Sequence, residues 1–297
     1  MDLQAMRAQL ETKGYVVVRE LIGREDVRRY IARLNELSGF RPSAVKKGLS
    51  ARGLSGSWYL PDGVTKLEPF WPLIFDETLL RAVRALVDPD VRYLQHSDLH
   101  VGFSAISWHR DSVNRQLGVG SDWDESQAPY RLVRVGIYLQ SYNESSFRLG
   151  FIPGSHRFSG QVTLGQRATE ARLKLLGGLS YLNPSFQMWA ANAEWVATEP
   201  GDCIIFDPRT IHSGSAITGP KYSVFLAYGK ENQHFYNHFN YYRRIRPELN
   251  YQEMPPALAA RLQAAGLLQD QQPEYDEIQG AWVPMPLLRN AVAQRVK

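Results

Sequence analysis

The first part of the chain carries apolar residues at helical spacing, every three or four positions, in three stretches. These stretches are residues 3–13, 24–38 and 77–87. A period near 3.6 gathers apolar side chains on one face, so we predict three amphipathic helices packed on a core. Gly14 and Gly39 are natural stops for the first two helices, and Asp76 is a suitable N-cap for the third. The β-branched run at 15–18 predicts a short strand.

From about Val91 the pattern changes to short β-branched and aromatic runs separated by Gly, Pro, Asn and Asp. The candidate strands are 91–96, 99–106, 131–140, 148–152, 203–206 and 222–228. Many short strands divided by turns predict a barrel or a double-sheet jelly roll. Residues 166–176 have a helical pattern and are expected to form an insertion between strands, and the tail from Pro255 begins as a helix.

Helices first and strands afterwards, without regular alternation, indicate an α+β chain. We predict one domain over residues 1–297, with a double-stranded β-helix core at about 90–230 and helices at both ends. All-β cores often run long as single domains, so the length does not require a division. With 44% hydrophobic residues the chain can form a globular core.

Charge and composition exclude several classes of partner. The net charge of +4, from 34 basic and 30 acidic residues, is too balanced to indicate nucleic-acid binding. No apolar run approaches the ~20 residues of a membrane span, and Met1–Ala5 does not begin a signal peptide. The single cysteine, Cys203, cannot form an internal disulfide. We therefore expect a cytoplasmic protein with a small-molecule substrate, no nucleic acid and no membrane; the oligomeric state is left open.

Three residues have the spacing of a metal site. His109 and Asp111 end a long apolar run and open a polar loop, and alternate residues of an extended segment point to one side. His212 follows a Gly-Asp turn and the apolar strand 203–206, which brings it to the rim of the sheet. Two histidines and one carboxylate with open coordination positions are typical of a non-haem Fe(II) oxygenase.

Other histidines are weighed against this group. His96 and Asp98 have the same spacing, but they lie at a break between two apolar runs, inside a predicted sheet, and we interpret them as structural. His100 either lines the pocket or is a satisfied core histidine. The remaining histidines, at 156, 234 and 238, are expected in a turn or in an aromatic cluster.

Three further residues suit the binding of an acid. Lys221 and Ser223 share a strand face nine residues beyond His212, so an ammonium and a hydroxyl could hold the far carboxylate of a chelating dicarboxylate. The alternative is that Lys221 is a solvated surface charge. Arg134 lies on the polar face of 131–140, where burial would require an anionic partner, a substrate or co-substrate; otherwise that face is exposed. The loop 112–130 could act as a lid.

Three segments together resemble the phytanoyl-CoA dioxygenase family, whose members are Fe(II)- and 2-oxoglutarate-dependent oxygenases on a double-stranded β-helix. These segments are Trp108–Asp111, Phe151–Arg157 and Gly201–His212. The resemblance spans roughly residues 90–230. It implies His109, Asp111 and His212 as iron ligands and places the distal carboxylate of 2-oxoglutarate near positions 221 and 223. The family usually has Arg at the first of these positions, and Lys221 cannot form the planar bidentate fork of arginine.

The resemblance implies an enzyme that uses Fe(II), 2-oxoglutarate and O2 to hydroxylate or otherwise oxidise a small metabolite, releasing succinate and CO2. Related halogenases replace the carboxylate ligand by a small residue, so Asp111 favours hydroxylation or another oxidation over halogenation. Two alternatives stay open: a non-catalytic jelly-roll protein that binds a metal or a small acid, and a hydroxylase of a macromolecule.

Overall fold

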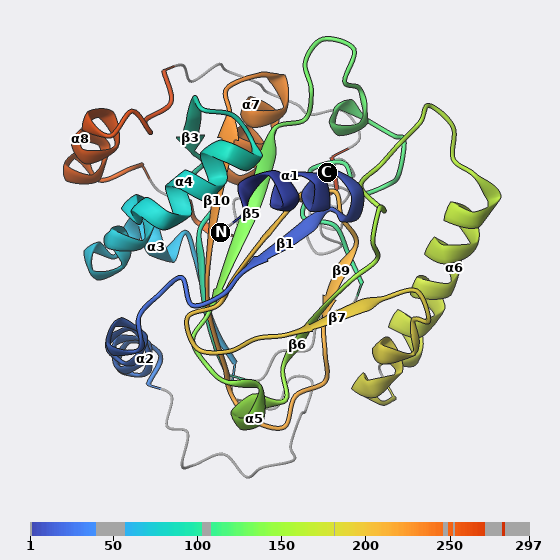
Figure 1. The fold of residues 1–297 in the computed structure, drawn as a ribbon, viewed down its shortest axis with the longest axis horizontal. Coiled ribbons are helices and arrows are strands. Elements are labelled where there is room, and N and C mark those ends of the chain that lie inside the picture. The colour runs from blue at the N-terminus through green and yellow to red at the C-terminus, as the bar shows by residue number, and fades with distance from the viewer. Residues whose placement is uncertain are drawn as a thin grey trace, which may run out of the picture.

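The computed structural model describes residues 2–39, 57–102, 108–180, 182–245, 249–251, 253–270 and 281–282. Within these residues two antiparallel sheets face each other (Figure 1). The larger sheet has the order β1-β8-β5-β10-β4-β2, and β3 also pairs with β10. Its strands are β1 (Tyr15–Val18), β2 (Ser57–Pro61), β3 (Val91–Tyr93), β4 (Asp98–Gly102), β5 (Leu132–Tyr138), β8 (Cys203–Phe206) and β10 (Lys221–Lys230). The smaller sheet, in the order β7-β6-β9, consists of β6 (Arg148–Phe151), β7 (Glu194–Ala197) and β9 (His212–Gly214).

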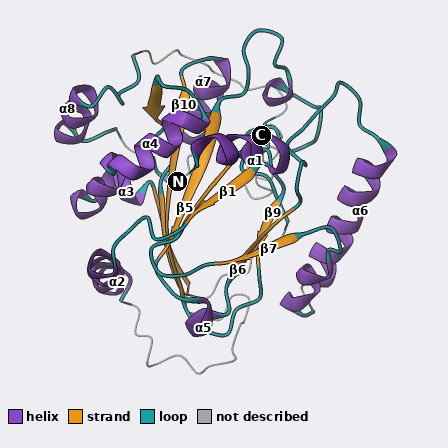
Figure 2. Ribbon diagram, viewed as in Figure 1, coloured by secondary structure: helices purple, strands orange, loops and turns teal. Residues whose placement is uncertain are grey.

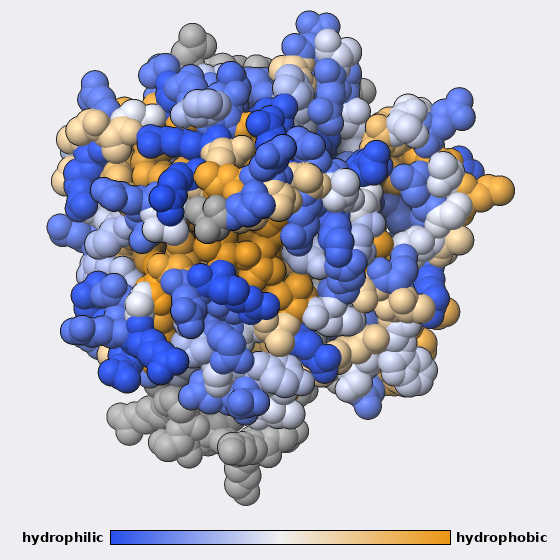
Figure 3. All heavy atoms as spheres, viewed as in Figure 1, coloured by the Kyte–Doolittle hydropathy of each residue, from blue (hydrophilic) through white to orange (hydrophobic). Residues whose placement is uncertain are grey.

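Helices cover the outer face of the larger sheet (Figure 2). The longer helices of the chain are α1 (Leu3–Lys13), α2 (Arg24–Ser38), α4 (Glu77–Leu86), α6 (Leu164–Leu179), α7 (Gln233–Asn240) and α8 (Pro256–Ala264). The remaining helical segments of the described residues are short α-helices, 3-10 helices and one π-helix: α3 (Gly63–Lys66), η2 (Glu68–Phe75), η3 (Ser121–Trp123), α5 (Tyr142–Ser145), η4 (Pro184–Trp189) and η5 (Tyr241–Ile245). Hydrophilic residues dominate the face seen in Figure 3, with apolar residues visible at its centre, between α1, α2 and α4. None of the helices in the described parts of the chain is long and apolar enough to span a bilayer.

Strand alternation sends polar residues into the space between the sheets. On β5, Val135 packs with the helices on the outer face, whereas Tyr138 belongs to an aromatic cluster between the sheets. On β10, Val224 faces outward in the same way, so its neighbour Ser223 faces inward. The interior of the jelly roll is therefore partly polar, which is the location that a ligand site requires.

The α+β jelly-roll prediction is confirmed. The helices at 3–13 and 24–38 have the predicted bounds, the third ends at Leu86, and the strand at 203–206 is confirmed residue for residue. The side chain of Asp76 accepts a hydrogen bond from Leu79 N at 2.8 Å, which confirms the N-cap. The predicted insertion helix lies between β6 and β7 and is longer than expected.

Several strand bounds were wrong. The strand predicted at 91–96 ends at Tyr93, and the one predicted at 131–140 covers only Leu132–Tyr138. The strand predicted at 99–106 begins at Asp98, and residues 103–106 lie outside the described residues. The strand predicted at 222–228 is longer, because β10 pairs with β3, β4 and β5 along its length.

Candidate metal centre

His109 and His212 meet through their backbones. Each backbone N donates a hydrogen bond to the carbonyl oxygen of the other at 3.0 Å, which forms an isolated antiparallel bridge. His212 is also the first residue of β9 and pairs with Phe151 of β6. The two imidazoles therefore project from neighbouring backbones, with ring centroids 4.3 Å apart.

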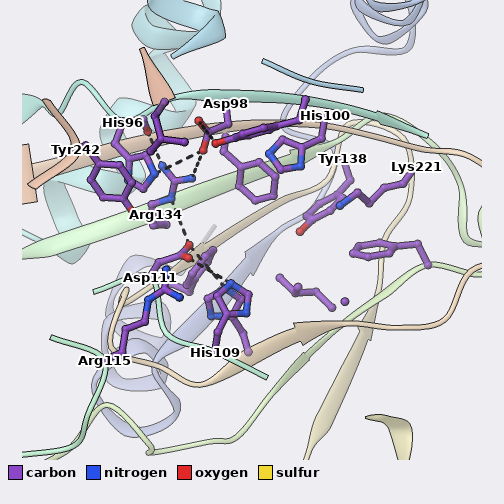
Figure 4. A pocket seen from close by; sticks show the side chains of 18 residues that line it. His96, Asp98, His100, His109, Asp111, Arg115, Arg134, Tyr138, Lys221 and Tyr242 are labelled. Carbon is purple, nitrogen blue, oxygen red and sulfur yellow. Dashed lines mark hydrogen bonds and ion pairs between the residues drawn. The ribbon is translucent and has the colours of Figure 1, made fainter. Parts of the chain in front are cut away.

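Asp111 completes the group from two residues beyond His109. Its backbone N donates to the carbonyl of Pro208 at 2.9 Å, which fixes the loop against the turn that precedes β9. One carboxylate oxygen lies 3.4 Å from Nε2 of His109, and the other lies 3.7 Å from Nε2 of His212. The three ligand atoms lie within 4.8 Å of one another, and no other group of this kind occurs in the described ranges. Figure 4 shows His109 and Asp111 side by side at one wall of the cavity.

The protonation states suit a divalent metal. Nδ1 of His212 lies 3.0 Å from the carbonyl oxygen of Thr210, so Nδ1 carries the proton and the Nε2 lone pair faces the group. Burial, together with His109, lowers the pKa of His212 to about 4. Burial opposes ionisation of Asp111, but the two imidazoles and Arg134 outweigh it and hold the pKa of this carboxyl well below its ordinary value. A neutral His212 and an ionised Asp111 are the forms that bind metal.

Arg134 lies behind the metal group, and only 3% of it is exposed. The alternative of a solvent-exposed face on β5 is therefore wrong. The anionic partner that its burial requires is Asp98, whose Oδ2 accepts from Nη2 of Arg134 at 3.0 Å. The guanidinium also donates to the carbonyl of His96, and its Nε lies 3.6 Å from Oδ2 of Asp111. His96 and Asp98 thus form a buried polar network with Arg134, as the structural interpretation of this pair predicted.

Lys221 and Ser223 lie inside the molecule at the start of β10. Lys221 is 3% exposed, so the surface-charge alternative is wrong. No described residue forms an ion pair with its ammonium, which lies 5.1 Å from the ring centre of Phe147. Burial lowers the pKa of Lys221 to about 8. Oγ of Ser223 is buried and has no hydrogen-bond partner among the described residues.

Tyr138 is a residue that the sequence interpretation did not single out. It pairs with Ser223 across β5 and β10, and its buried hydroxyl likewise has no hydrogen-bond partner in the described part of the chain. The sequence signal was present, because Tyr138 alternates with the apolar residues of its strand in the same way as Arg134. Tyr138 and Lys221 lie together on one side of the metal group in Figure 4.

A cavity of about 250 Å³ connects the metal group with Tyr138 and Lys221. Its polar lining consists of the metal group with Tyr59, His96, Asp98, His100, Arg115, Arg134, Tyr138, Lys221 and Tyr242. Its apolar lining consists of Phe147, Leu149, Phe206, Gly214, Phe225 and Leu249. His100 thus lines the pocket, and no described residue forms a hydrogen bond with its ring nitrogens. Burial, and to a smaller extent the positive charge of Lys221, keep the pKa of His100 well below its ordinary value.

The loop after Asp111 is folded around Asn114. The backbone N of Asn114 donates to the Asp122 carboxylate at 3.0 Å, and Nε1 of Trp123 donates to the backbone carbonyl of Asn114 at 3.0 Å. Asp124 is exposed. Of the residues proposed for a lid, only Arg115 lines the cavity.

A jelly roll with two histidines and one carboxylate at a cavity between its sheets is the architecture of the Fe(II)- and 2-oxoglutarate-dependent oxygenases. Within that class, the chain belongs to the phytanoyl-CoA dioxygenase family, whose model matches residues 10–223. No curated protein shows significant sequence similarity to the chain.

Solved structures share the fold at low sequence identity. HygX from Streptomyces hygroscopicus, with nickel and 2-oxoglutarate bound, is 17% identical with a TM-score of 0.52 over 76% of this chain and 87% of its own. EctD from S. alaskensis, with bound Fe, is 19% identical with a TM-score of 0.51 over 76% of each chain. The non-haem carbocyclase SnoK from nogalamycin biosynthesis is 16% identical with a TM-score of 0.52, over 76% of this chain and 84% of its own.

Proposed function

We propose that this protein is a non-haem oxygenase that uses Fe(II), 2-oxoglutarate and O2 to hydroxylate a small molecule. The observation that carries the proposal is the pairing of two features in one cavity. A compact His, Asp, His group lies at one wall, and a buried ammonium without an ion-pair partner among the described residues lies at the other. Relatives of the same fold hold iron, or nickel together with 2-oxoglutarate.

In this proposal His109 and His212 hold the iron through Nε2, and Asp111 holds it through a carboxylate oxygen. All three residues line the cavity, so a substrate could reach a metal that they would hold. When bound, the iron and 2-oxoglutarate supply the oxidising chemistry with O2 and yield succinate and CO2. The carbonyl of Thr210 keeps the His212 ring in the tautomer that offers Nε2.

Lys221, Ser223 and Tyr138 are proposed to bind the distal carboxylate of 2-oxoglutarate. A buried charge and two buried hydroxyls without partners among the described residues are unfavourable in the free protein, and a carboxylate would satisfy all three. Lysine is a point donor and cannot form the two parallel hydrogen bonds of an arginine. The hydroxyls of Ser223 and Tyr138 would supply the directional hydrogen bonds instead.

Arg134 is proposed to act on the metal group and not on the distal carboxylate. Its shortest contacts are with Asp98 and the carbonyl of His96, and its remaining Nε faces Asp111. A guanidinium at this position would hold the Asp111 carboxylate in the orientation that presents one oxygen to the iron.

The reaction proposed is hydroxylation, because Asp111 supplies a carboxylate at the position that related halogenases leave open. The protein's part is to exclude water and to hold the substrate beside the metal. The wall of Phe147, Leu149 and Phe206 is apolar and buried, which serves the first purpose.

The test is an anaerobic titration of metal-free protein with Fe(II) and then 2-oxoglutarate, followed by the visible charge-transfer band of the chelate. We expect a saturable band that Asp111→Ala weakens or removes. Asp124→Ala is the matched control, since Asp124 is an exposed carboxylate of the following loop, and it should leave the band unchanged. Iron binding without a band would contradict the co-substrate assignment. Absence of iron binding would contradict the oxygenase proposal and favour a binding protein.

A further inference from the structure

A second cation without an acid partner among the described residues lies at the end of the cavity opposite Lys221. Arg115 follows the metal group in the same loop and lines the cavity. Figure 4 shows Arg115 and Lys221 on opposite sides of His109 and Asp111. The two cations therefore cannot serve one carboxylate of a ligand held between them.

The guanidinium of Arg115 is held in place but has no acid partner among the described residues. Its Cζ lies 3.7 Å from the ring centre of Trp282. Trp282 is itself fixed, because its backbone N donates to the carbonyl of Val113 at 3.0 Å and its carbonyl accepts from the hydroxyl of Tyr241 at 2.6 Å. No described residue accepts a hydrogen bond from the guanidinium or forms an ion pair with it, and its Nε is buried.

The other arginines around the site are all paired. Arg110 contacts Glu170 at 2.9 Å, Arg134 contacts Asp98 at 3.0 Å, and Arg209 contacts Asp207 at 2.9 Å. Each of these contacts gives a buried guanidinium an anionic partner within the protein. Among these four arginines, Arg115 alone forms no ion pair with a described residue, so its guanidinium is available to a ligand.

The charge of the cavity favours an anion at this end. Asp98 balances Arg134, which leaves Asp111, Lys221 and Arg115 as the other charged groups of the lining. A divalent metal beside Asp111 and a dianionic 2-oxoglutarate beside Lys221 would leave a single positive charge, that of Arg115. An unbalanced charge in a site of low dielectric attracts an opposite charge more strongly than it would in water.

We propose, resting on the function proposed above, that the substrate is a small monocarboxylic acid whose carboxylate binds Arg115. A planar guanidinium matches a carboxylate through two parallel hydrogen bonds. The ring of Tyr242 and the side chain of Leu249, which are 4% and 8% exposed, cluster with Val113 close to Arg115 and suit a compact apolar body between the carboxylate and the metal. The cavity of about 250 Å³ lies below the ~300–1,000 Å³ usual for ligand pockets and must also hold 2-oxoglutarate, so the acid is small.

The test uses the anaerobic complex of the protein with Fe(II) and 2-oxoglutarate, and the probes are paired compounds. The panel contains monocarboxylates with linear, branched and aromatic bodies, together with the neutral amide of each. The readout is the change in the charge-transfer band when a compound binds beside the metal. We expect at least one acid to change the band saturably, with its amide binding about tenfold or more weakly, as the loss of a charge-assisted pair implies.

Variants then assign the effect to Arg115. Arg115→Met should weaken binding of that acid about tenfold or more, while its amide is unaffected. Arg115→Lys should keep part of the affinity, because it keeps the charge and loses the fork. Arg243→Met is the matched control, since Arg243 also lies over an aromatic ring, that of Phe239, but does not line the cavity.

Three results would overturn the proposal: equal binding of acids and amides, unchanged acid binding in Arg115→Met, or no effect of any acid up to millimolar concentration. Each of these counts only where the Fe(II) and 2-oxoglutarate band itself forms. A missing band would instead contradict the proposed function, so the two failures are distinguishable.

Discussion

At the residue scale, the main anomaly is a buried ammonium, that of Lys221, with no acid partner among the described residues. Lys221 is buried, and burial alone lowers its pKa to about 8. Such a group destabilises the folded chain wherever it is charged, since the desolvation is not compensated. A bound acid would offset this destabilisation, because its carboxylate would replace the hydration that the Lys221 ammonium loses on burial.

The affinity for 2-oxoglutarate should therefore depend on pH. Lys221 is protonated below about pH 8 in the free protein, so the dissociation constant should rise above that pH, by up to about tenfold per unit. His100 and Tyr138 face it from the adjacent strands, but burial holds the pKa of His100 far below this range and that of Tyr138 far above it. Calorimetry on the Ni(II)-loaded protein measures the effect. Lys221→Arg stays charged and should flatten the profile; a flat wild-type profile would contradict the assignment.

Arg134 gives a second prediction at this scale. Arg134→Met leaves the carboxylate of Asp98 buried without its cation, and we expect a loss of about 3–5 kcal/mol in the free energy of unfolding. Urea denaturation measures it. Asp98→Asn combined with Arg134→Met should recover part of the loss, because the uncompensated charge is gone. Additive losses would show that the two side chains are not coupled.

At the element scale, the end of α1 supports the turn that leads to His212. Gly14 ends the helix with φ +86°, and its carbonyl accepts from Asp207 N at 2.9 Å and from Oγ1 of Thr210 at 3.1 Å. A Cβ at Gly14 would lie 2.2 Å from Oγ1 of Thr210 and 2.6 Å from Nδ1 of His156. A helix far from the ligands in sequence thus fixes the backbone that carries one of them.

Gly14→Ala should accordingly weaken both the fold and the metal site. The left-handed backbone costs about 1–2 kcal/mol with a side chain, and the clash with Thr210 adds to it and displaces the turn before His212. Gly39→Ala is a matched control, because Gly39 also ends a helix at positive φ but a Cβ there would meet nothing within 4 Å. Thermal unfolding and Fe(II) titration of both variants should show weaker metal binding in Gly14→Ala alone. Equal effects of the two substitutions on unfolding and on metal binding would mean that the left-handed backbone alone, and not the clash with Thr210, causes the loss.

The sequence predicts helices and strands where the hydrophobic periodicity is strong. It does not predict a strand that forms only because other strands pair with it. The helices before Val91 follow from a 3.6-residue period, and β8 follows from an apolar run between turns. Strand β9 is only His-Ser-Gly and has no alternation of its own; it is a strand because Gly150 and Phe151 pair with it. The metal group was predicted from local spacing and chain order. Tyr138 and Arg115 were not singled out as ligand contacts, because their role depends on which groups lack partners in three dimensions.

At the scale of the whole molecule, the proposed ligands join the two sheets. Lys221 and Ser223 belong to β10 of the larger sheet, whereas His212 belongs to β9 of the smaller one. A 2-oxoglutarate that chelates the metal and reaches Lys221 would span the space between them. Binding to the folded state alone stabilises it by mass action, by about 2.7 kcal/mol at a ligand concentration 100 times Kd.

Stabilisation by the two ligands should therefore be greater than additive. We expect 2-oxoglutarate alone to change the melting temperature little, because only the Lys221 end can hold it. Ni(II) alone should raise the melting temperature, and both together should raise it by more than the sum of the separate shifts. Lys221→Met should keep the shift caused by the metal and lose the excess, whereas Asp111→Ala should lose both. Additive shifts in the wild type would mean that metal and acid bind independently. The proposal that 2-oxoglutarate links the metal group to Lys221 would then be wrong.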